Sequence, residues 1–217
     1  MSAMVWVSWS ELRKREAAVL DACAGLILTR PLTEVTIKAV AESSGLPLWA
    51  AYGAIQRVAR DRPHLIRRGV LQISNRIAER IGEARAAEGS VMAAIEAFIE
   101  DVAAVVRSDD FAGLYRAVLC EGAFHRWLHE VYEEKVAGVF CRELAARVEA
   151  ASRGNGVAVN FRAGATREIL RRLETSLILP SLLPGRAASM EDEAALVRAI
   201  ARDAFSRTYA WDLGEAA

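Results

Sequence analysis

Apolar residues recur every three or four positions along most of the chain, which is the spacing of amphipathic helices. No segment alternates polar and apolar residues as a β-strand would. The fold is therefore predicted to be all-α, with about nine helices: three in an N-terminal head, one connector and five in a body. The pattern places them at 10–29, in two short segments between 36 and 52, and at 62–87, 91–107, 109–119, 125–151, 162–183 and 190–211. The stretches SRGNG at 152–156 and LLPGRAAS at 182–189 are predicted to be loops.

Residues 36–52, TIKAVAESSGLPLWAAY, carry the most specific pattern. Thr36 is a good helix N-cap, and Val40 and Ala41 give the helix after it an apolar inner face. Gly45 stands where the chain must leave that helix, a position that favours a positive φ angle. Pro47 suits the start of a second helix. The segment is predicted to be a helix-turn-helix, the unit that enters the DNA major groove.

The motif Thr-apolar-x-x-Val-Ala-x-x-Ser-Gly-Leu, followed after five residues by Tyr52, resembles the DNA-binding motif of tetracycline-repressor-type (TetR) regulators. The body stretch DFAGLYRAVLCEGAFHRWLHEVYEE is also similar to that family. The resemblance implies a DNA-binding domain at 1–62 and a ligand-binding and dimerisation domain at 63–217. Ala54 and Ile55 stand where the family has aromatic residues, and Gln56–Leu65 is longer by a few residues than the family's pattern.

The recognition helix is predicted to span Pro47–Tyr52, where no Arg, Lys, Asn or Gln is present to read base edges. Leu48 and Ala50 are expected to pack on thymine methyl groups, and Trp49 on sugar or base edges. The alternative is a helix that no longer reads DNA. The predicted DNA-binding residues are Thr36, Lys38, Pro47, Leu48, Trp49, Ala50, Tyr52, Arg57 and Arg60.

The formal net charge is zero, but it is unevenly distributed. Residues 1–68 hold 10 Lys and Arg against six Asp and Glu, and the remainder holds 18 against 22. The basic residues flank the motif on both sides, at Arg13, Lys14 and Arg15 and at Arg57, Arg60, Arg62, Arg67 and Arg68. Such a distribution favours phosphate contacts over a merely solvated surface.

Other classes of site and location receive little support from the sequence. The three cysteines are odd in number and widely spaced, which indicates reduced thiols and a cytoplasmic protein. No apolar run is long enough for a membrane span, and the N-terminus has no secretory signal pattern. His125 and His129 lack the accompanying residues of a zinc motif. No catalytic or nucleotide-binding motif is present, so no enzymatic activity, cofactor or metal is predicted.

The body contains two further sets of candidate residues. Aromatic and apolar side chains in its first helices are predicted to line a pocket for an apolar or aromatic effector, although plain core packing is the alternative. These are Phe98, Phe111, Tyr115, Leu119, Phe124, Trp127 and Tyr132. The last two helices are predicted to form a symmetric dimer interface, again with core packing as the alternative. That set is Leu173, Leu177, Leu182, Leu196, Ile200 and Phe205.

Together these patterns predict a ligand-responsive transcriptional regulator. As a homodimer it would repress by binding a pseudo-palindromic double-stranded DNA operator, and an apolar or aromatic small molecule would release it. A second hypothesis belongs to another class: a lipid- or isoprenoid-binding accessory protein with the TetR-type fold that does not bind DNA. The apolar recognition helix favours the second hypothesis, and the basic clusters around the motif favour the first.

Overall fold

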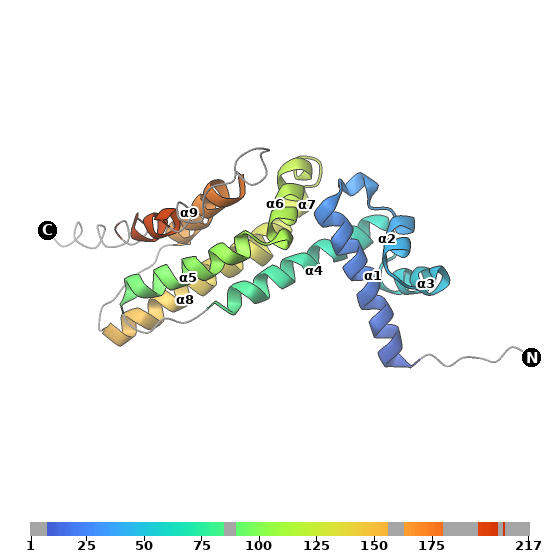
Figure 1. Ribbon diagram of the computed structural model, residues 1–217, viewed down its shortest axis with the longest axis horizontal. Coiled ribbons are helices and arrows are strands. Elements are labelled where there is room, and N and C mark those ends of the chain that lie inside the picture. The colour runs from blue at the N-terminus through green and yellow to red at the C-terminus, as the bar shows by residue number, and fades with distance from the viewer. Residues whose placement is uncertain (1–7, 85–89, 156–162, 180–194, 204–205, 207–217) are drawn as a thin grey trace, which may run out of the picture. The chain divides into compact units, whose positions relative to one another are not determined.

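The computed structural model describes residues 8–84, 90–155, 163–179, 195–203 and 206 (Figure 1). These residues contain helices and no strand, which confirms the all-α prediction. The α-helices are α1 (Trp9–Thr29), α2 (Ile37–Ser43), α3 (Leu48–Val58), α4 (Arg62–Gly82), α5 (Val91–Val106), α6 (Asp109–Glu121), α7 (Arg126–Tyr132), α8 (Gly138–Asn155) and α9 (Ala163–Leu173), and residues 195–203 are also helical. Across the described ranges, no helix has the length and apolar character needed to cross a bilayer.

Shorter segments of other helical types complete the chain. A 3₁₀ turn at Leu32–Glu34 follows α1, and π-helical segments at Glu133–Ala137 and Glu174–Ile178 follow α7 and α9. The predicted loop at 152–156 is wrong for residues 152–155, because α8 continues to Asn155. Ser152 is buried there and donates its hydroxyl proton to the Val148 carbonyl at 2.7 Å, so its polar group is satisfied inside the helix. The predicted loop at 182–189 lies outside the described residues.

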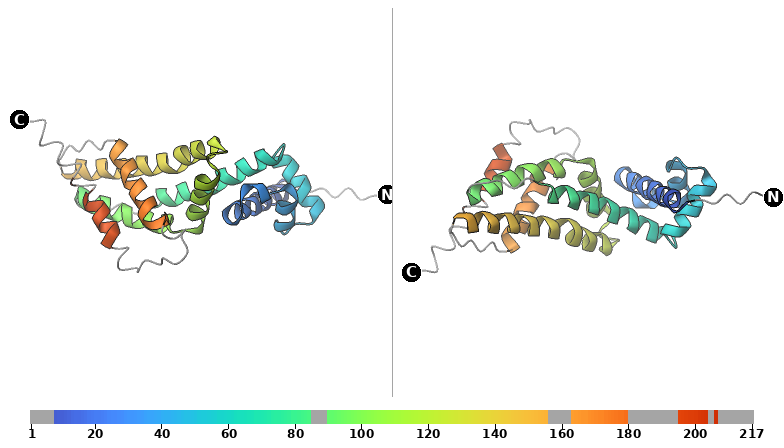
Figure 2. Two further views of the ribbon diagram at one scale, coloured as in Figure 1. Left: turned by 90° about the horizontal axis from the view of Figure 1, so that it is seen from above. Right: turned by 90° about the horizontal axis from the view of Figure 1, so that it is seen from below.

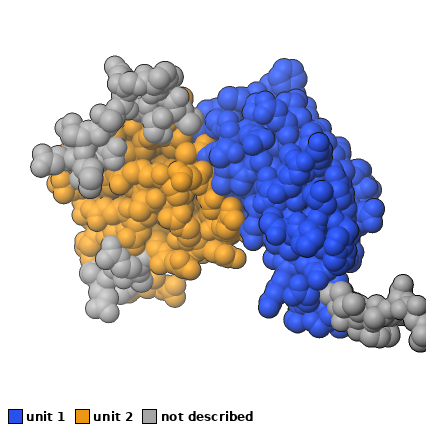
Figure 3. Space-filling view, turned by 45° about the vertical axis from the view of Figure 1, so that its right-hand side comes forward, with its two compact units in different colours: residues 1–74, 113–129 blue, residues 75–112, 130–217 orange. Residues whose placement is uncertain are grey.

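The chain divides into two compact units (Figure 3). Unit 1 comprises residues 1–74 and 113–129, and unit 2 comprises residues 75–112 and 130–217. Most of α6 thus belongs with the three N-terminal helices, although it is far from them in sequence. The functional boundary at residue 62 stays a prediction.

Unit 1 is built around α1, which packs against both α2 and α3 (Figure 1). The inner face of α1 and the stripes that face it consist of small and medium apolar side chains, which allow the short helices to approach closely. α6 also approaches α1 closely: a Cβ atom added at Gly113 would lie 2.9 Å from the Cα of Leu28. The fully buried residues of this core include Val19, Cys23, Ala24, Ile27, Val40, Ala41, Ala51, Ala54, Leu65, Val70 and Ile73.

Unit 2 contains α5 and α8 side by side, with α9 packed against α8 (Figure 2). The rings of Phe98 and Phe140 meet in its core with their centroids 5.3 Å apart. Its core also holds a carboxyl group: Glu174 is only 4% exposed and accepts a hydrogen bond from the Tyr132 hydroxyl. Burial raises the pKa of Glu174, and the hydrogen bond from Tyr132 opposes that shift.

The positive φ angle at Gly45 gives a test of the helix-turn-helix geometry. Gly45 has φ +69°, where an L-residue is strained, so Gly45→Ala should lower the free energy of unfolding by about 1 kcal/mol. The matched control is Gly25→Ala in α1, where a Cβ meets no atom within 4 Å. Because Ala is the better helix former, that change should raise stability by roughly 0.5–1 kcal/mol. Urea denaturation measures both, and equal effects of the two changes would contradict the assigned turn.

Candidate nucleic-acid interface

The helix-turn-helix is formed by α2, the turn at Gly45 and α3. The Thr36 hydroxyl accepts a hydrogen bond from the Ala39 amide at 3.1 Å and caps α2, as its sequence position predicts. The Ser44 hydroxyl then donates to the Ala41 carbonyl at 2.8 Å, which satisfies one of the carbonyls left open at the end of α2. Both ends of the first motif helix are therefore fixed by local hydrogen bonds.

The recognition helix α3 is longer than the sequence analysis predicted. It extends to Val58 instead of ending at Tyr52, and Gln56 and Arg57 belong to it. The reason is its buried stripe, which continues through Ala54, Ile55 and Val58. This i, i+1, i+4 spacing is visible in the sequence and could have shown that the helix continues. The interpretation that the recognition helix lacks Gln and Arg is thereby corrected.

The side of α3 that faces away from the core carries Leu48, Trp49, Tyr52 and Gln56, all of which are exposed. Leu48 is 53% exposed, Trp49 71% and Tyr52 39%. Ala50 is only 4% exposed, because its position turns it toward the core of unit 1. Ala50 therefore cannot pack on a thymine methyl group as predicted.

The Trp49 ring contacts a side chain of α1. The guanidinium of Arg15 lies 5.4 Å from the centre of the indole ring, within the range of a cation–π interaction. Arg15 is itself oriented by Glu11, whose carboxylate is 3.1 Å from its Nε atom. Arg15 of α1 thus orients the exposed side chain of Trp49 on α3.

Each of the three cations in the list of predicted DNA-binding residues, Lys38, Arg57 and Arg60, has a carboxylate neighbour. Lys38 lies 3.8 Å from Glu42 and Arg60 3.4 Å from Asp61, and both cationic side chains are largely exposed. Exposed ion pairs of this kind contribute little to stability, so these cations can exchange a carboxylate for a phosphate at small cost.

Arg57 and Arg62 have additional structural contacts. Arg57 pairs with Glu16 of α1 at 2.9 Å and so joins the end of α3 to α1. Arg62 donates to the Val35 carbonyl at 2.8 Å and to the Leu32 carbonyl. The position of Arg62 in the basic cluster suggested a phosphate contact. In the structure its guanidinium instead binds backbone carbonyls of the segment between α1 and α2.

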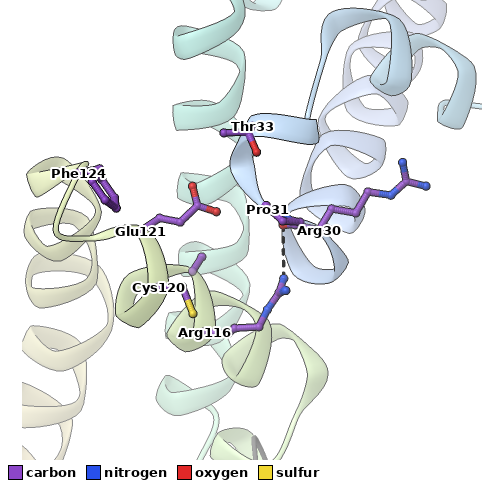
Figure 4. Close-up of a pocket in the computed structure, with 8 residues that line it drawn as sticks. Arg30, Pro31, Thr33, Arg116, Cys120, Glu121 and Phe124 are labelled. Atoms are coloured by element: carbon purple, nitrogen blue, oxygen red, sulfur yellow. Dashed lines mark hydrogen bonds between the residues drawn. The ribbon is translucent and has the colours of Figure 1, made fainter.

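A cavity of about 350 Å³ lies beside the C-terminal end of α1 (Figure 4). Arg116 of α6 donates from one Nη atom to the carbonyls of Ile27 and Leu28 at 3.2 and 3.0 Å, and so caps α1. Glu121 accepts a hydrogen bond from the Leu32 amide at 2.6 Å. The lining consists of Arg30, Pro31, Thr33, Arg116, Ala117, Cys120, Glu121 and Phe124. These two polar links attach α6 to the head, and no sequence motif indicated either of them.

The residues predicted to bind an effector are distributed over both units. Phe98, Phe111 and Tyr132 are in unit 2, where the rings of Phe111 and Tyr132 meet edge to face at 6.2 Å. The other four, Tyr115, Leu119, Phe124 and Trp127, are in unit 1.

The four residues in unit 1 differ in their surroundings. Tyr115 is buried, whereas Leu119 is exposed. Trp127 lies against Arg67, whose guanidinium is 5.7 Å from the ring centre. Phe124 is 84% exposed and lines the cavity at the end of α1.

Three of the six residues predicted to form the dimer interface are buried within the chain itself. Leu173, Leu177 and Ile200 are buried in unit 2, and Leu196 is half-buried. Leu182 and Phe205 lie outside the described residues. In the part of the chain that the structure describes, no three His, Cys, Asp or Glu side chains are grouped to hold a metal ion.

Comparison with solved structures gives the fold. A proposed transcriptional regulator from Streptomyces coelicolor A3(2) aligns with a TM-score of 0.62 and 19% identity over 87% of this chain and 97% of that one. A second, from Pseudomonas aeruginosa PAO1, aligns with a TM-score of 0.61 and 14% identity over 93% and 92%. A proposed TetR-family regulator from Vibrio parahaemolyticus aligns with 0.59 and 17% over 87% and 97%. No family model and no curated protein matches the sequence.

The three cysteines provide a test of the packing in unit 1. Cys23 is fully buried under α4, and burial raises the pKa of its thiol to about 12, so it stays protonated even at pH 10. Cys120 is exposed and Cys141 half-buried. Mass spectrometry after iodoacetamide treatment should show Cys120 modified first and Cys23 only after unfolding, and Cys120→Ser should remove the fast phase. Rapid modification of Cys23 in the folded protein would contradict this core.

Proposed function

We propose that this chain, which has the fold of TetR-type regulators, is a DNA-binding transcriptional regulator that acts as a homodimer. The observation that carries the proposal is the exposed side of α3. Leu48 and Trp49 project into solvent from a helix whose opposite side is fully packed. Leaving two large apolar side chains exposed next to each other is unfavourable unless they have a partner. The major groove is the partner that a helix-turn-helix presents them to.

The charges around α3 support the same partner. Lys38 and Arg60 bracket α3 in sequence, and their side chains are 77% and 85% exposed. Arg13, Lys14 and Arg68 add three exposed cations to the same unit. Cations on either side of a recognition helix bind the phosphates that border the groove and set the position of the helix along it.

The proposal includes release by a small apolar or aromatic effector and, with it, action as a repressor. The cavity beside Phe124 supports a binding site, since its volume of about 350 Å³ is at the small end of ligand pockets. Arg116 and Glu121 line this cavity; Arg116 also donates to a carbonyl at the end of α1, and Glu121 accepts from an amide in the 3₁₀ turn after it. A ligand that binds better when these bonds are broken would shift the population of the head away from its DNA-binding conformation.

A lipid-binding accessory protein is the second candidate, and one observation favours it. Trp9 is 82% exposed and, like Trp49, lies in the head next to basic residues. Aromatic and basic side chains together are also found where proteins contact membrane interfaces. Sedimentation with anionic lipid vesicles distinguishes the candidates: binding to vesicles without specific binding to any duplex would favour the lipid-binding protein.

Phosphate contacts give the first test of the proposed function. Binding to a 30-base-pair duplex should weaken linearly on a plot of log affinity against log salt. Arg60→Gln should reduce the slope by about one, because one phosphate contact is lost. The control is Arg153→Gln on α8, an arginine that is also exposed and also paired with a carboxylate. Its slope should equal that of the wild type, and an equal reduction in both variants would contradict the assigned contact.

The dimer gives a second test. A two-fold operator needs two heads, so the protein should sediment at twice its chain mass of 23.7 kDa at micromolar concentration. Equilibrium sedimentation measures this directly. A monomer over the whole range from 1 to about 100 times the DNA dissociation constant would contradict the proposed homodimer.

A further inference from the structure

We propose that α3 recognises A·T base pairs, with Leu48 and Trp49 reading thymine methyl groups and Gln56 reading adenine. The inference rests on the proposed function and names the bases that the recognition helix selects. Three observations support it: the side chains that α3 exposes, the absence of an unpaired Arg or Lys on that side of the helix, and the contact that orients Trp49.

The exposed side of α3 has no free cation to read guanine. Guanine is usually recognised by a bidentate Arg or Lys that reaches its O6 and N7 atoms. The helix contains one such residue, Arg57, and its Nε atom donates to Glu16 at 2.9 Å. Reading guanine with Arg57 would require breaking this pair with α1, so G·C pairs gain little from α3.

The N-terminal part of α3 exposes apolar side chains that can contact apolar groups in the major groove. Of the four base pairs, those containing thymine carry a methyl group in the major groove. Leu48 and Trp49 are the first two residues of the helix and are 53% and 71% exposed. Residues at the start of a recognition helix are among those that reach base edges. Contact between these side chains and thymine methyl groups removes apolar surface of both from water.

The Trp49 side chain is already oriented in the absence of DNA. Arg15 lies 5.4 Å from its ring centre, and Glu11 holds Arg15 at 3.1 Å. A side chain that is already oriented loses less conformational entropy on binding. Arg15 is therefore a positioning residue for Trp49, and it acts from α1 without having to contact a base.

Gln56 adds the complementary contact two turns further along the helix. It lies eight residues after Leu48 and four after Tyr52, which places all three on one side of α3. Its carboxamide has the donor and acceptor that match N6 and N7 of adenine. Methyl contacts select thymine and the Gln56 contact selects adenine, so both ends of α3 favour A·T pairs.

Gly53 leaves room between these contacts. A Cβ atom there would meet only the Nη1 atom of Arg57, at 3.9 Å. Glycine in the middle of a helix costs stability relative to alanine, and here no close packing explains its presence. The missing side chain lets the helix backbone approach a base edge between Trp49 and Gln56.

The test begins with selection of duplexes from a random pool at fixed salt. The selected half-site should contain A·T pairs where α3 lies, and each thymine there is then replaced by uracil, which removes only the methyl group. Affinity should fall about fourfold for each contacted methyl. Replacing a contacted T·A pair by C·G should also lower affinity, and 5-methylcytosine in place of that cytosine should recover about the same fourfold factor, because the methyl group returns without the A·T pair.

Variants assign the effect to the residues. Trp49→Ala should abolish the thymine-to-uracil difference at one position. Because the Trp49 side chain is 71% exposed, the variant should stay folded, which circular dichroism checks. Arg15→Lys keeps the charge but not the planar group, so the difference should shrink while the salt slope stays constant. Lys38→Gln is the matched control and should weaken binding to thymine and uracil duplexes equally.

Each other outcome has a definite meaning. Specific binding with affinities for thymine and uracil duplexes within a factor of about 1.5 would overturn the methyl readout. A selected half-site rich in G·C pairs would overturn the inference while leaving the proposed function intact. Failure to select any sequence, with binding that depends on salt alone, would overturn both.

Discussion

The packing of the small apolar stripe of α3 against α1 is the constraint on which the rest of the head depends. Ala51 and Ala54 are fully buried, and Ile55 and Val58 continue the stripe. Because an α-helix has 3.6 residues per turn, burying this stripe fixes which residues point outward. Leu48 and Gln56 are among those residues. The chemistry of the interface is therefore set by residues that never touch a ligand.

Hydrogen bonds from polar side chains also hold the helices of the head together. Arg62, Arg116 and Glu121 all bond backbone groups at the end of α1 or in the turn after it. Buried or half-buried helix ends need such partners, and charged donors supply stronger bonds than water-exposed amides do. Two of these residues come from α6, a helix more than 80 positions later in the chain. The head is thus held together partly by a segment that follows the connector helix α4.

Much of this fold could be predicted from the sequence. Helical periodicity located α1, α2, α4, α5 and α6, because each carries apolar residues at regular spacing, but it placed the end of α4 at residue 87 where the helix ends at Gly82. Thr36 acts through a hydrogen bond to an amide three positions away and Gly45 through its own φ angle, and the sequence indicates both. The family motif ends at Tyr52 and so predicts too short a helix, whereas the apolar spacing of Ala54, Ile55 and Val58 indicates the observed end of α3.

Long-range contacts were beyond sequence reasoning. Nothing local shows that Arg62 serves two carbonyls about 30 residues earlier, or that Arg57 pairs with Glu16. The burial of Ala50, Leu173 and Leu177 also depends on which helix covers them. An apolar residue signals burial but does not identify its neighbour.

If the exposed side of α3 reads bases, this chain should have a preferred DNA sequence. The most direct measurement is the ratio of dissociation constants for a selected duplex and a scrambled duplex of the same composition, at one salt concentration near physiological. The account predicts a ratio of about a thousand, at the low end for specific DNA-binding proteins, because apolar contacts carry most of the recognition. A ratio near one would contradict it, since phosphate contacts alone bind both duplexes equally.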